Sequence, residues 1–561
     1  MSRPLRSDAA FSASRRAQWR GLGLTDEDFK KPKIAVVNSS SELAVCFAHL
    51  DGVAKVVKDA IRMAGGVPFE VRTTAPSDFI VSAAKGGGFI LPSRDLVTND
   101  IEAQVGAAML DGMVCLSSCD KTPPGHLMAA GRLDIPSITV VGGYQKSGEL
   151  NGEPVDVEDV FLEQVHVRIG RPGNRDLNAM ADVAIQGPGV CAGMATANSM
   201  AVVCEALGMT LPGNAPVAAN SRTMFDYARQ AGARIVRMVE EDLTPRKVMT
   251  RESFVNACAA VLAVCGSINC VKHMQAIAVE AGVDVDIFAL MRELTGKIPV
   301  LSAIRPNGSY RIEDFDRAGG ARAVLKQLLP LIEPGAMTVT GKTLAETLEG
   351  YEVANEEVIR PLARAYTYKA PIVILKGSLA PDSAIAKMGL RTDGDRPETF
   401  DGPAIVYETG PDALEALAKG EVKPGQVLVA RNQGVVGGPG MAGGAASIVF
   451  AIDGAGLGGQ IAFITDGQLS GLCNKGLTIA EVSPEAATGG PISLVRNGDR
   501  ITVDVDAGTI ELLVPADELE RRRAEAPRPL NPATGWLAQY RDEVRPMSRG
   551  ATLAPVSTQD A

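Results

Sequence analysis

Short apolar runs alternate with helical segments over the first part of the chain. Three runs are typical of buried strands: 33–40 ("KIAVVNSS"), 112–118 ("GMVCLSS") and 137–143 ("SITVVGG"). Between them, residues 50–66 and 125–136 read as helices. This alternation is typical of a mostly parallel sheet covered by helices. We therefore predict an N-terminal α/β domain of αβα type over residues 1–367, with functional loops at the carboxyl ends of the strands.

From about Tyr368 the pattern changes to short apolar runs separated by Gly, Pro, Asn and Asp. Examples are "APIVILKGS", "GPAIVYET", "GQVLVARNQG" and "QIAFITDGQ", with few long helical segments between them. Closely spaced strands with turn residues between them favour a sheet or a barrel. The second prediction is a β-rich, barrel-like domain over residues 368–561.

Composition narrows the class of protein. A length of 561 residues exceeds what one hydrophobic core usually supports, in agreement with two domains. The net charge is −10, without a basic block, so nucleic acid is not an expected partner. The longest apolar run, around Ala257 to Val271, is interrupted by polar residues and is too short to span a bilayer, so no membrane partner is expected. The N-terminal residues lack the apolar core of a secretory signal, and we expect a cytoplasmic location.

The nine cysteines fall into two groups. Cys46, Cys119 and Cys191 lie beside Gly, Pro or Ser at element boundaries, where a thiolate can face a cleft. Their spacing is far longer than that of short metal-binding motifs, so it does not distinguish a metal ligand from a nucleophilic thiol. A thiol-dependent enzyme with Cys119 as nucleophile is therefore one alternative. The other six lie in apolar or helical surroundings, which favours buried side chains: Cys115, Cys204, Cys258, Cys265, Cys270 and Cys473.

Several long strings carry a family resemblance. They are "CDKTPPGHLMAAGRLDIP", "GPGVCAGMATANSMAVVCEALGMTLPGN", "KGSLAPDSA", "GGPGM" and "ITDGQLSGLCNKGLTIAEVSPEAATGGPI". In this order they resemble the dihydroxy-acid dehydratase and sugar-acid dehydratase family, over residues 15–553. The resemblance implies an iron–sulfur hydro-lyase that converts a 2,3-dihydroxy carboxylate, either a branched-chain dihydroxy acid or an aldonate, to a 2-oxo-3-deoxy acid. It also implies a homodimer or homotetramer.

The resemblance assigns ligands for two metal centres. Cys46, Cys119 and Cys191 match cluster ligands, and the presence of Cys46 favours a [2Fe–2S] cluster. Three-cysteine ligation leaves an iron site open for the departing hydroxyl oxygen. Asp120 and Asp78 match ligands of Mg²⁺, a hard cation that prefers oxygen. For Asp78, a solvated turn aspartate is the alternative.

Lys121 is unexpected beside two metals, because cations repel an ammonium. By resemblance it is a carbamylated lysine with a catalytic role, whose carbamate is a further oxygen ligand for Mg²⁺. Reaction with carbon dioxide requires the neutral amine, so we expect a lowered pKa. The alternative is an ordinary salt bridge to Asp120.

The catalytic base is expected at Ser470, in "TDGQLSG". A serine hydroxyl is a weak base unless a nearby cation stabilises its alkoxide. Without the resemblance this segment is only a turn after a strand.

Two positions depart from the family pattern. Family members usually have a glutamate Mg²⁺ ligand two residues after "GGPGM", where this chain has Gly443. Gln433 likewise stands where the biosynthetic members carry a glutamate. A catalytically weak paralogue that acts as an iron or redox sensor is therefore an alternative to an enzyme.

Overall fold

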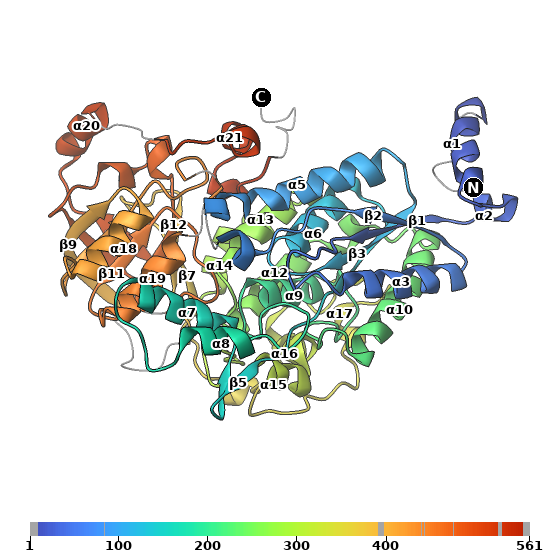
Figure 1. Cartoon of the computed structure of the whole chain (residues 1–561), viewed down its shortest axis with the longest axis horizontal. Coiled ribbons are helices and arrows are strands. Elements are labelled where there is room, and N and C mark those ends of the chain that lie inside the picture. The colour runs from blue at the N-terminus through green and yellow to red at the C-terminus, as the bar shows by residue number, and fades with distance from the viewer. Residues whose placement is uncertain are drawn as a thin grey trace.

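The computed structural model describes residues 9–82, 85–390, 398–438, 440–441, 444–474, 476–525 and 530–553. In Figure 1 the N-terminal half runs from blue to yellow-green, and the C-terminal half lies beside it in orange and red. One continuous set of buried apolar residues extends through both halves. The domain boundary at residues 367 and 368 stays a prediction.

The N-terminal half is built on a parallel sheet with the strand order β2-β1-β3-β4. Strands β1, β3 and β4 are buried along their whole length, as expected for a sheet covered on both faces. Helices α3 and α10 cover one face, and α5 and α6 lie on the other (Figure 1). The bounds are β1 (Lys33–Asn38), β2 (Val67–Arg72), β3 (Gly112–Ser117), β4 (Ser137–Val141), α3 (Leu50–Met63), α5 (Pro92–Ile101), α6 (Thr122–Leu133) and α10 (Arg222–Glu240).

The strand order reverses between β1 and β3. From β1 the chain proceeds outward to β2, whereas from β3 it proceeds outward to β4 on the other side. In open α/β sheets, ligands bind in the crevice at the carboxyl ends of the strands beside such a reversal. The loop after β1 contains Cys46, and the loop after β3 contains Cys119. The topology therefore brings two cysteines that are distant in sequence to one edge of the sheet.

The predicted alternation of strands and helices does not continue beyond β4. Helices dominate from there to residue 364, and the apolar run around Ala257 to Val271 forms the end of α12 and the beginning of α13. Both helices are buried on nearly every side, so their sequences lack an amphipathic period. The elements are β5 (Gly148–Leu150), β6 (Glu153–Val155), α7 (Val157–Arg168), α8 (Leu177–Val183), α9 (Thr196–Ala206), α11 (Pro245–Val248), α12 (Arg251–Ala263), α13 (Asn269–Ala281), α14 (Ile287–Leu294), α15 (Ile312–Ala318), α16 (Gly320–Leu328) and α17 (Leu344–Thr347).

The C-terminal half contains a sheet of eight described strands in the order β14-β13-β9-β10-β11-β12-β8-β7. A bridge between Lys376, just after β7, and Thr509 in β14 joins its two edges, so the sheet is nearly closed into a barrel. This confirms the predicted barrel-like architecture. The elements are β7 (Ile372–Leu375), β8 (Ser383–Lys387), β9 (Thr399–Tyr407), β10 (Val427–Ala430), β11 (Ala462–Thr465), β12 (Leu477–Ser483), β13 (Arg500–Asp504), β14 (Thr509–Leu512), α18 (Gly410–Lys419) and α19 (Gly444–Gly454).

Buried polar contacts join the two halves. Lys272 of α13 pairs with Glu481 of β12 at 2.5 Å, and both side chains are fully buried. The C-terminal segment, with α20 (Ala516–Glu525) and α21 (Gly535–Glu543), returns to the N-terminal half, where Arg94 donates to the carbonyl of Ala551 at 2.6 Å. Helices α1 (Ala9–Gly21), α2 (Asp26–Lys30) and α4 (Asp78–Ser82) complete the fold. Among the described residues, no helix has the length and apolar character needed to cross a membrane.

Candidate active site

The two cysteine loops at the edge of the parallel sheet are tied together. Ser118 Oγ donates a hydrogen bond of 2.6 Å to the carbonyl of Cys46, and the N–H of Ser118 donates to Thr122 Oγ1 at 2.8 Å. Cys119 has a φ of +61°, a conformation that is uncommon and costly for a residue with a side chain. A hydrogen bond with the Cys46 thiol, together with burial, holds the pKa of Cys119 well above its ordinary value.

Cys191 reaches the same place from the segment before α9. The side-chain amide of Asn198 donates bonds of 2.8 Å to the carbonyls of Cys191 and Gly193, which fixes this segment against the helix. Burial raises the pKa of Cys191, and so do the nearby charges of Asp120 and Cys46. The fold thus gathers the three loop cysteines. The six other cysteines are buried, as predicted.

Asp78, Cys119 and Asp120 form a group whose ligand atoms all lie within 4.8 Å of one another. Burial, followed by the charge of Asp120, raises the pKa of Asp78 to about 8. Lys121 Nζ lies 3.7 Å from a carboxylate oxygen of each aspartate and is buried without a hydrogen-bond partner among the described residues. Asp78 is the first residue of α4 and its side chain is 27% exposed, so it is neither in a turn nor fully solvated.

The expected lowering of the Lys121 pKa is wrong for this structure. Burial disfavours the charged ammonium, but the carboxylates of Asp78 and Asp120 outweigh burial and hold the pKa of Lys121 above its ordinary value. The sequence argument placed this lysine among cations, whereas its neighbours within the chain are anions. Loss of its proton therefore requires another cation that compensates these carboxylates.

Ser470 lies in the loop after β11. Its Oγ accepts the N–H of Leu472 at 3.2 Å, and a backbone donor at this position stabilises negative charge on the oxygen. The thiol sulfur of Cys473 lies 3.9 Å from the same oxygen. The sequence pattern correctly predicted a buried Cys473 but not this contact. The available signal was its position three residues after the serine in "SGLC".

Two buried carboxylates fix the neighbouring loop, residues 431–438. Asp466 accepts the N–H groups of Asn432 and Gln433 at 3.1 and 2.9 Å, and Glu485 accepts the N–H of Gly437 at 2.7 Å. No sequence motif singled out either carboxylate. Gln433, one of the two departures from the family pattern, lines the cavity described next. Gly443, the other departure, lies outside the described residues.

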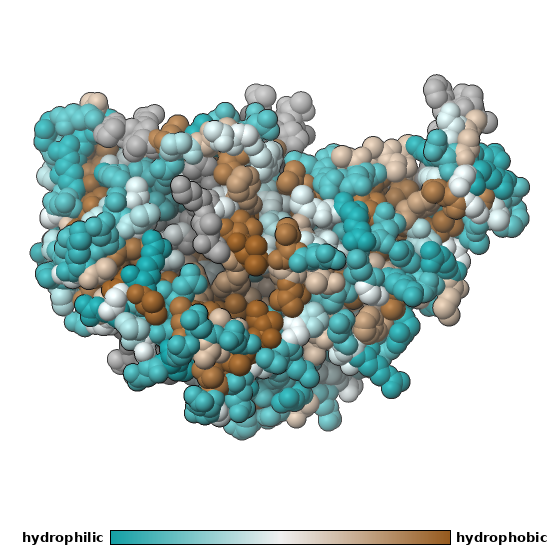
Figure 2. All heavy atoms as spheres, viewed as in Figure 1, coloured by the Kyte–Doolittle hydropathy of each residue, from teal (hydrophilic) through white to brown (hydrophobic). Residues whose placement is uncertain are grey.

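A cavity of about 580 Å³ lies between the two halves of the molecule. Asp78, Cys119, Asp120, Cys191 and Ser470 all contribute to its wall. In Figure 2 apolar side chains gather on the visible face between the two halves. The apolar part of the cavity wall consists mainly of Phe79, Ile90, Phe161, Leu414, Leu469 and Leu472.

Four helices direct their N-terminal ends at this cavity. Thr196 of α9, Asn269 of α13, Gly410 of α18 and Gly444 of α19 line it, and each is the first residue of its helix as described. The N-terminus of a helix carries a partial positive charge and unpaired N–H groups, which favour anions. The cavity therefore suits a small carboxylate whose hydrocarbon part faces the apolar wall.

The donor set fits the two metal centres that the sequence predicts. Three gathered thiols are typical ligands of an iron–sulfur cluster, and the adjacent carboxylates suit a hard cation. The nitrogen of Lys121 is the further observation, because it is buried beside Asp78 and Asp120 but makes no hydrogen bond among the described residues.

Comparison with known proteins decides the family. The model "Dihydroxy-acid/6-phosphogluconate dehydratase N-terminal" matches residues 31–347, and the corresponding C-terminal model matches residues 357–551. The chain belongs to this dehydratase family. It is therefore a hydro-lyase.

Relatives named dihydroxy-acid dehydratase resemble nearly the whole chain. The protein of Pyrococcus abyssi is 42% identical over 96% of this chain and 98% of its own length. That of Methanothrix thermoacetophila is 42% identical over 98% and 100%. That of Ignicoccus hospitalis is 41% identical over 96% and 94%.

Proposed function

We propose that the chain removes water from a 2,3-dihydroxy carboxylate with a hydrocarbon side chain, giving the 2-oxo-3-deoxy acid. The observation that carries this proposal is that Cys119, Asp120 and Ser470, from opposite halves, line one partly apolar cavity. The names of the relatives agree with this substrate class. The apolar wall suits the hydrocarbon part of a branched-chain dihydroxy acid, whereas the hydroxyls of an aldonate would have to pair with polar lining residues such as Arg168, Asn269 and Gln468.

The donors would hold a [2Fe–2S] cluster on Cys46, Cys119 and Cys191. Asp78, Asp120 and a carbamylated Lys121 would hold Mg²⁺. When bound, the two centres supply Lewis acidity toward the leaving 3-hydroxyl and the carboxylate.

The protein groups carry the proton chemistry. Ser470 Oγ removes the proton from C2 as an alkoxide, to whose stabilisation the N–H of Leu472 contributes and a bound cation would contribute the larger part. The C3–O bond breaks, the hydroxide leaves, and Ser470 returns a proton to it to form water. The remaining enol then tautomerises to the 2-oxo acid. The helix N-termini orient the substrate carboxylate.

The remaining expectations concern the oligomeric state and the location of the protein in the cell. We expect a homodimer or homotetramer in the cytoplasm. The sensor alternative is not favoured, since the relatives are named as dehydratases.

The test is anaerobic purification followed by assay of 2-oxo acid from a methyl-branched 2,3-dihydroxy acid and from an aldonate. We expect brown protein that prefers the branched acid. Cys46→Ser, Cys119→Ser and Cys191→Ser should each lose iron, and Ser470→Ala should keep iron but lose turnover. Cys258→Ala, at a buried cysteine outside the site, is the control.

Other outcomes have distinct meanings. Full iron content in all three loop variants contradicts the cluster assignment. Brown protein without turnover supports the sensor, and active colourless protein supports the thiol-dependent enzyme.

A further inference from the structure

A buried ion pair lies one hydrogen bond away from the wall of the active-site cavity. Lys272 of α13 and Glu481 of β12 pair at 2.5 Å without exposed side-chain surface, and the Lys272 ammonium also donates to the side-chain oxygen of Asn269. Asn269 is the first residue of α13 and lines the cavity, with only 3% of its surface exposed. The ion pair therefore lies directly behind a residue of the cavity wall.

The ammonium fixes the orientation of the Asn269 carboxamide. An ammonium can only donate hydrogen bonds, so the atom of Asn269 that faces Lys272 must be the oxygen Oδ1. The nitrogen Nδ2 then faces Thr196, to whose Oγ1 it donates at 3.1 Å. A carboxamide nitrogen carries two hydrogens, and within the described part of the chain Nδ2 donates only this one hydrogen bond. One N–H of Asn269 is therefore available to a ligand in the cavity.

The backbone around Asn269 is held independently of the ion pair. The backbone N–H of Asn269 donates to Ser267 Oγ at 3.2 Å, and Lys387 of β8 donates to the carbonyl of Gly266 at 2.7 Å. Removal of the ion pair should therefore release the carboxamide of Asn269 and leave its backbone in place.

The loop that carries the catalytic base packs against the same wall. A Cβ added at Gly471, next to Ser470, would lie 3.0 Å from the Cα of Ala195 and 3.3 Å from the Cβ of Ser267. These two residues stand one position before α9 and two positions before Asn269. The carboxylate carbon of the substrate is bonded to C2, so the carboxylate must lie beside the base that takes the C2 proton. The wall that contains Asn269 is thus on the correct side of the cavity.

We propose that Asn269 binds the substrate carboxylate through its available N–H, and that Lys272 and Glu481 are positioning residues that keep its carboxamide in the donating orientation. This inference rests on the proposed function. The N-terminus of α13 adds a partial positive charge at the same place. Burial lowers the pKa of Lys272 to about 8, and Glu481 opposes this effect, so the ammonium persists at neutral pH. Without the ammonium the carboxamide can turn its oxygen toward the carboxylate, which that oxygen repels.

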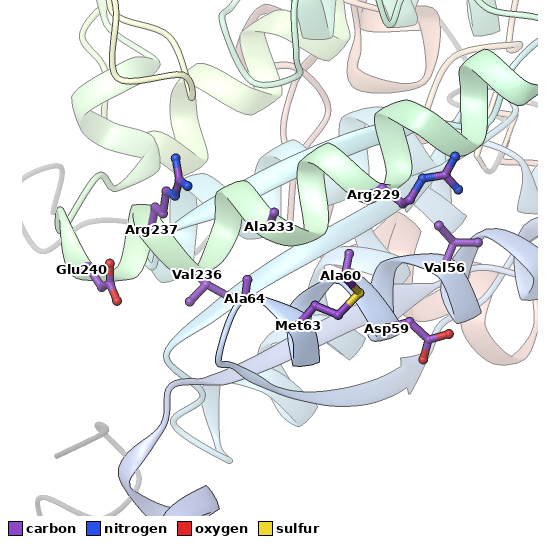
Figure 3. Close-up of a pocket in the computed structure, with 10 residues that line it drawn as sticks. All are labelled: Val56, Asp59, Ala60, Met63, Ala64, Arg229, Ala233, Val236, Arg237 and Glu240. Atoms are coloured by element: carbon purple, nitrogen blue, oxygen red, sulfur yellow. The ribbon is translucent and has the colours of Figure 1, made fainter.

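The other large cavity, of about 540 Å³ between α3 and α10, is built differently. Its buried lining residues are the apolar Ala60 and Val236. Its charged lining residues are all exposed (Figure 3): Asp59, Arg229, Arg237 and Glu240. A carboxylate there would meet surface charges on flexible side chains, whereas the active-site cavity offers a buried donor of fixed orientation.

The experiment replaces both members of the ion pair by methionine in anaerobically purified holoenzyme. Apolar side chains of similar volume often replace a buried ion pair without loss of stability, so K272M/E481M should fold. Its KM should rise about tenfold, the effect of losing one hydrogen bond to a charged group. Its kcat should change less than about twofold, because binding energy common to substrate and transition state affects KM alone. The dissociation constant of the 2-oxo acid product, measured by calorimetry, should rise together with KM.

Two further variants separate positioning from general loosening. Asn269→Ala should raise KM and the product dissociation constant by about as much, and adding K272M/E481M to it should have little further effect, since both changes remove the same contact. The matched control is R132M/E280M. It removes another ion pair of α13, between Arg132 and Glu280 at 2.7 Å, whose members lie outside the cavity lining. This control should keep the KM of the wild type.

Each contrary outcome has its own meaning. Wild-type KM and product binding in folded K272M/E481M, or in Asn269→Ala, would overturn the proposal. So would an equal rise of KM in R132M/E280M, or a full additional rise when the variants are combined. Wild-type protein that binds the 2-oxo acid but dehydrates no dihydroxy acid would refute the proposed function, and the product dissociation constants of the variants would still decide the role of Asn269. Wild-type protein that does not bind the 2-oxo acid would contradict the carboxylate site itself.

Discussion

Lys121 shows how a single side chain depends on what surrounds it. Its nitrogen is enclosed, makes no hydrogen bond within the described residues, and lies 3.7 Å from the oxygens of Asp78 and Asp120. These carboxylates keep its pKa high, so the ammonium is the stable form in the chain by itself. A carbamate would add a further anion to this group. Carbamylation should therefore occur only together with a divalent cation.

The corresponding prediction is a carbamate that depends on both Lys121 and Mg²⁺. Protein supplied with ¹³C-bicarbonate and Mg²⁺ should give a carbamate carbon signal by NMR, and removal of Mg²⁺ should abolish it. Lys121→Arg should lose the signal and about 100-fold or more of the activity, because arginine cannot supply an oxygen ligand. Lys33→Arg, at a buried lysine outside the cavity, should keep both. A signal that persists in Lys121→Arg would assign the carbamate to another lysine.

At the scale of elements, the active site depends on loops that buried carboxylates hold in place. Asp466, just after β11, accepts the N–H groups of Asn432, Gln433 and Ala486 with its two oxygens. Asparagine has one such oxygen, and its amide group would face a backbone donor. Asp466→Asn therefore leaves a buried N–H unpaired.

We predict that Asp466→Asn lowers the free energy of unfolding by about 1–3 kcal/mol. It should also raise KM, since Gln433 lines the cavity and belongs to the released loop. Urea denaturation and steady-state kinetics measure the two effects. Asp182→Asn, at an exposed aspartate, should change stability by no more than about 0.5 kcal/mol. Equal stability of Asp466→Asn and the wild type would mean that the loop is held by other contacts.

Elements with a local signal could be predicted from the sequence. Strands β1, β3 and β4 are uninterrupted apolar runs, and the rule for the carboxyl ends of strands correctly predicts that Cys119 faces a cleft. Helices α12 and α13 were harder to predict, because a helix that is buried on nearly all sides lacks the alternation of apolar and polar residues that marks an amphipathic helix. Two features could not be predicted, because the sequence alone does not specify which residues pair. They are the closure of the barrel through Lys376 and Thr509, and the contact between Cys473 and Ser470. The gathering of the site residues was expected from the family resemblance, not from their spacing.

At the scale of the whole molecule, the C-terminal segment fastens the chain back onto the N-terminal half. Arg94 and Asp95 are fully or nearly fully buried, and Arg94 donates to the carbonyl of Ala551 at 2.6 Å. The N–H of Leu553 donates to Asp95 at 3.2 Å. Arg94 also contacts His273 of α13, and the first residue of this helix, Asn269, lines the active-site cavity. The C-terminal segment is therefore connected through Arg94 to a helix that borders the cavity. Loss of the hydrogen bond to Ala551 would leave the buried guanidinium group of Arg94 without one of its acceptors.

Gly550 is the position where this docking can be tested with one added carbon. Its φ is +73°, and a Cβ there would lie 2.5 Å from the backbone nitrogen of Ala276 in α13, which cannot move aside. Gly535 has a similar φ of +57° with open space around it. Gly535→Ala should cost only the backbone strain, about 1 kcal/mol. Gly550→Ala should cost about 3 kcal/mol or more, because the segment must also withdraw from Arg94. Urea midpoints, with limited proteolysis to report release of the tail, measure the difference. Equal costs at the two glycines, with the tail equally protected, would show that the segment is not held against α13 in solution.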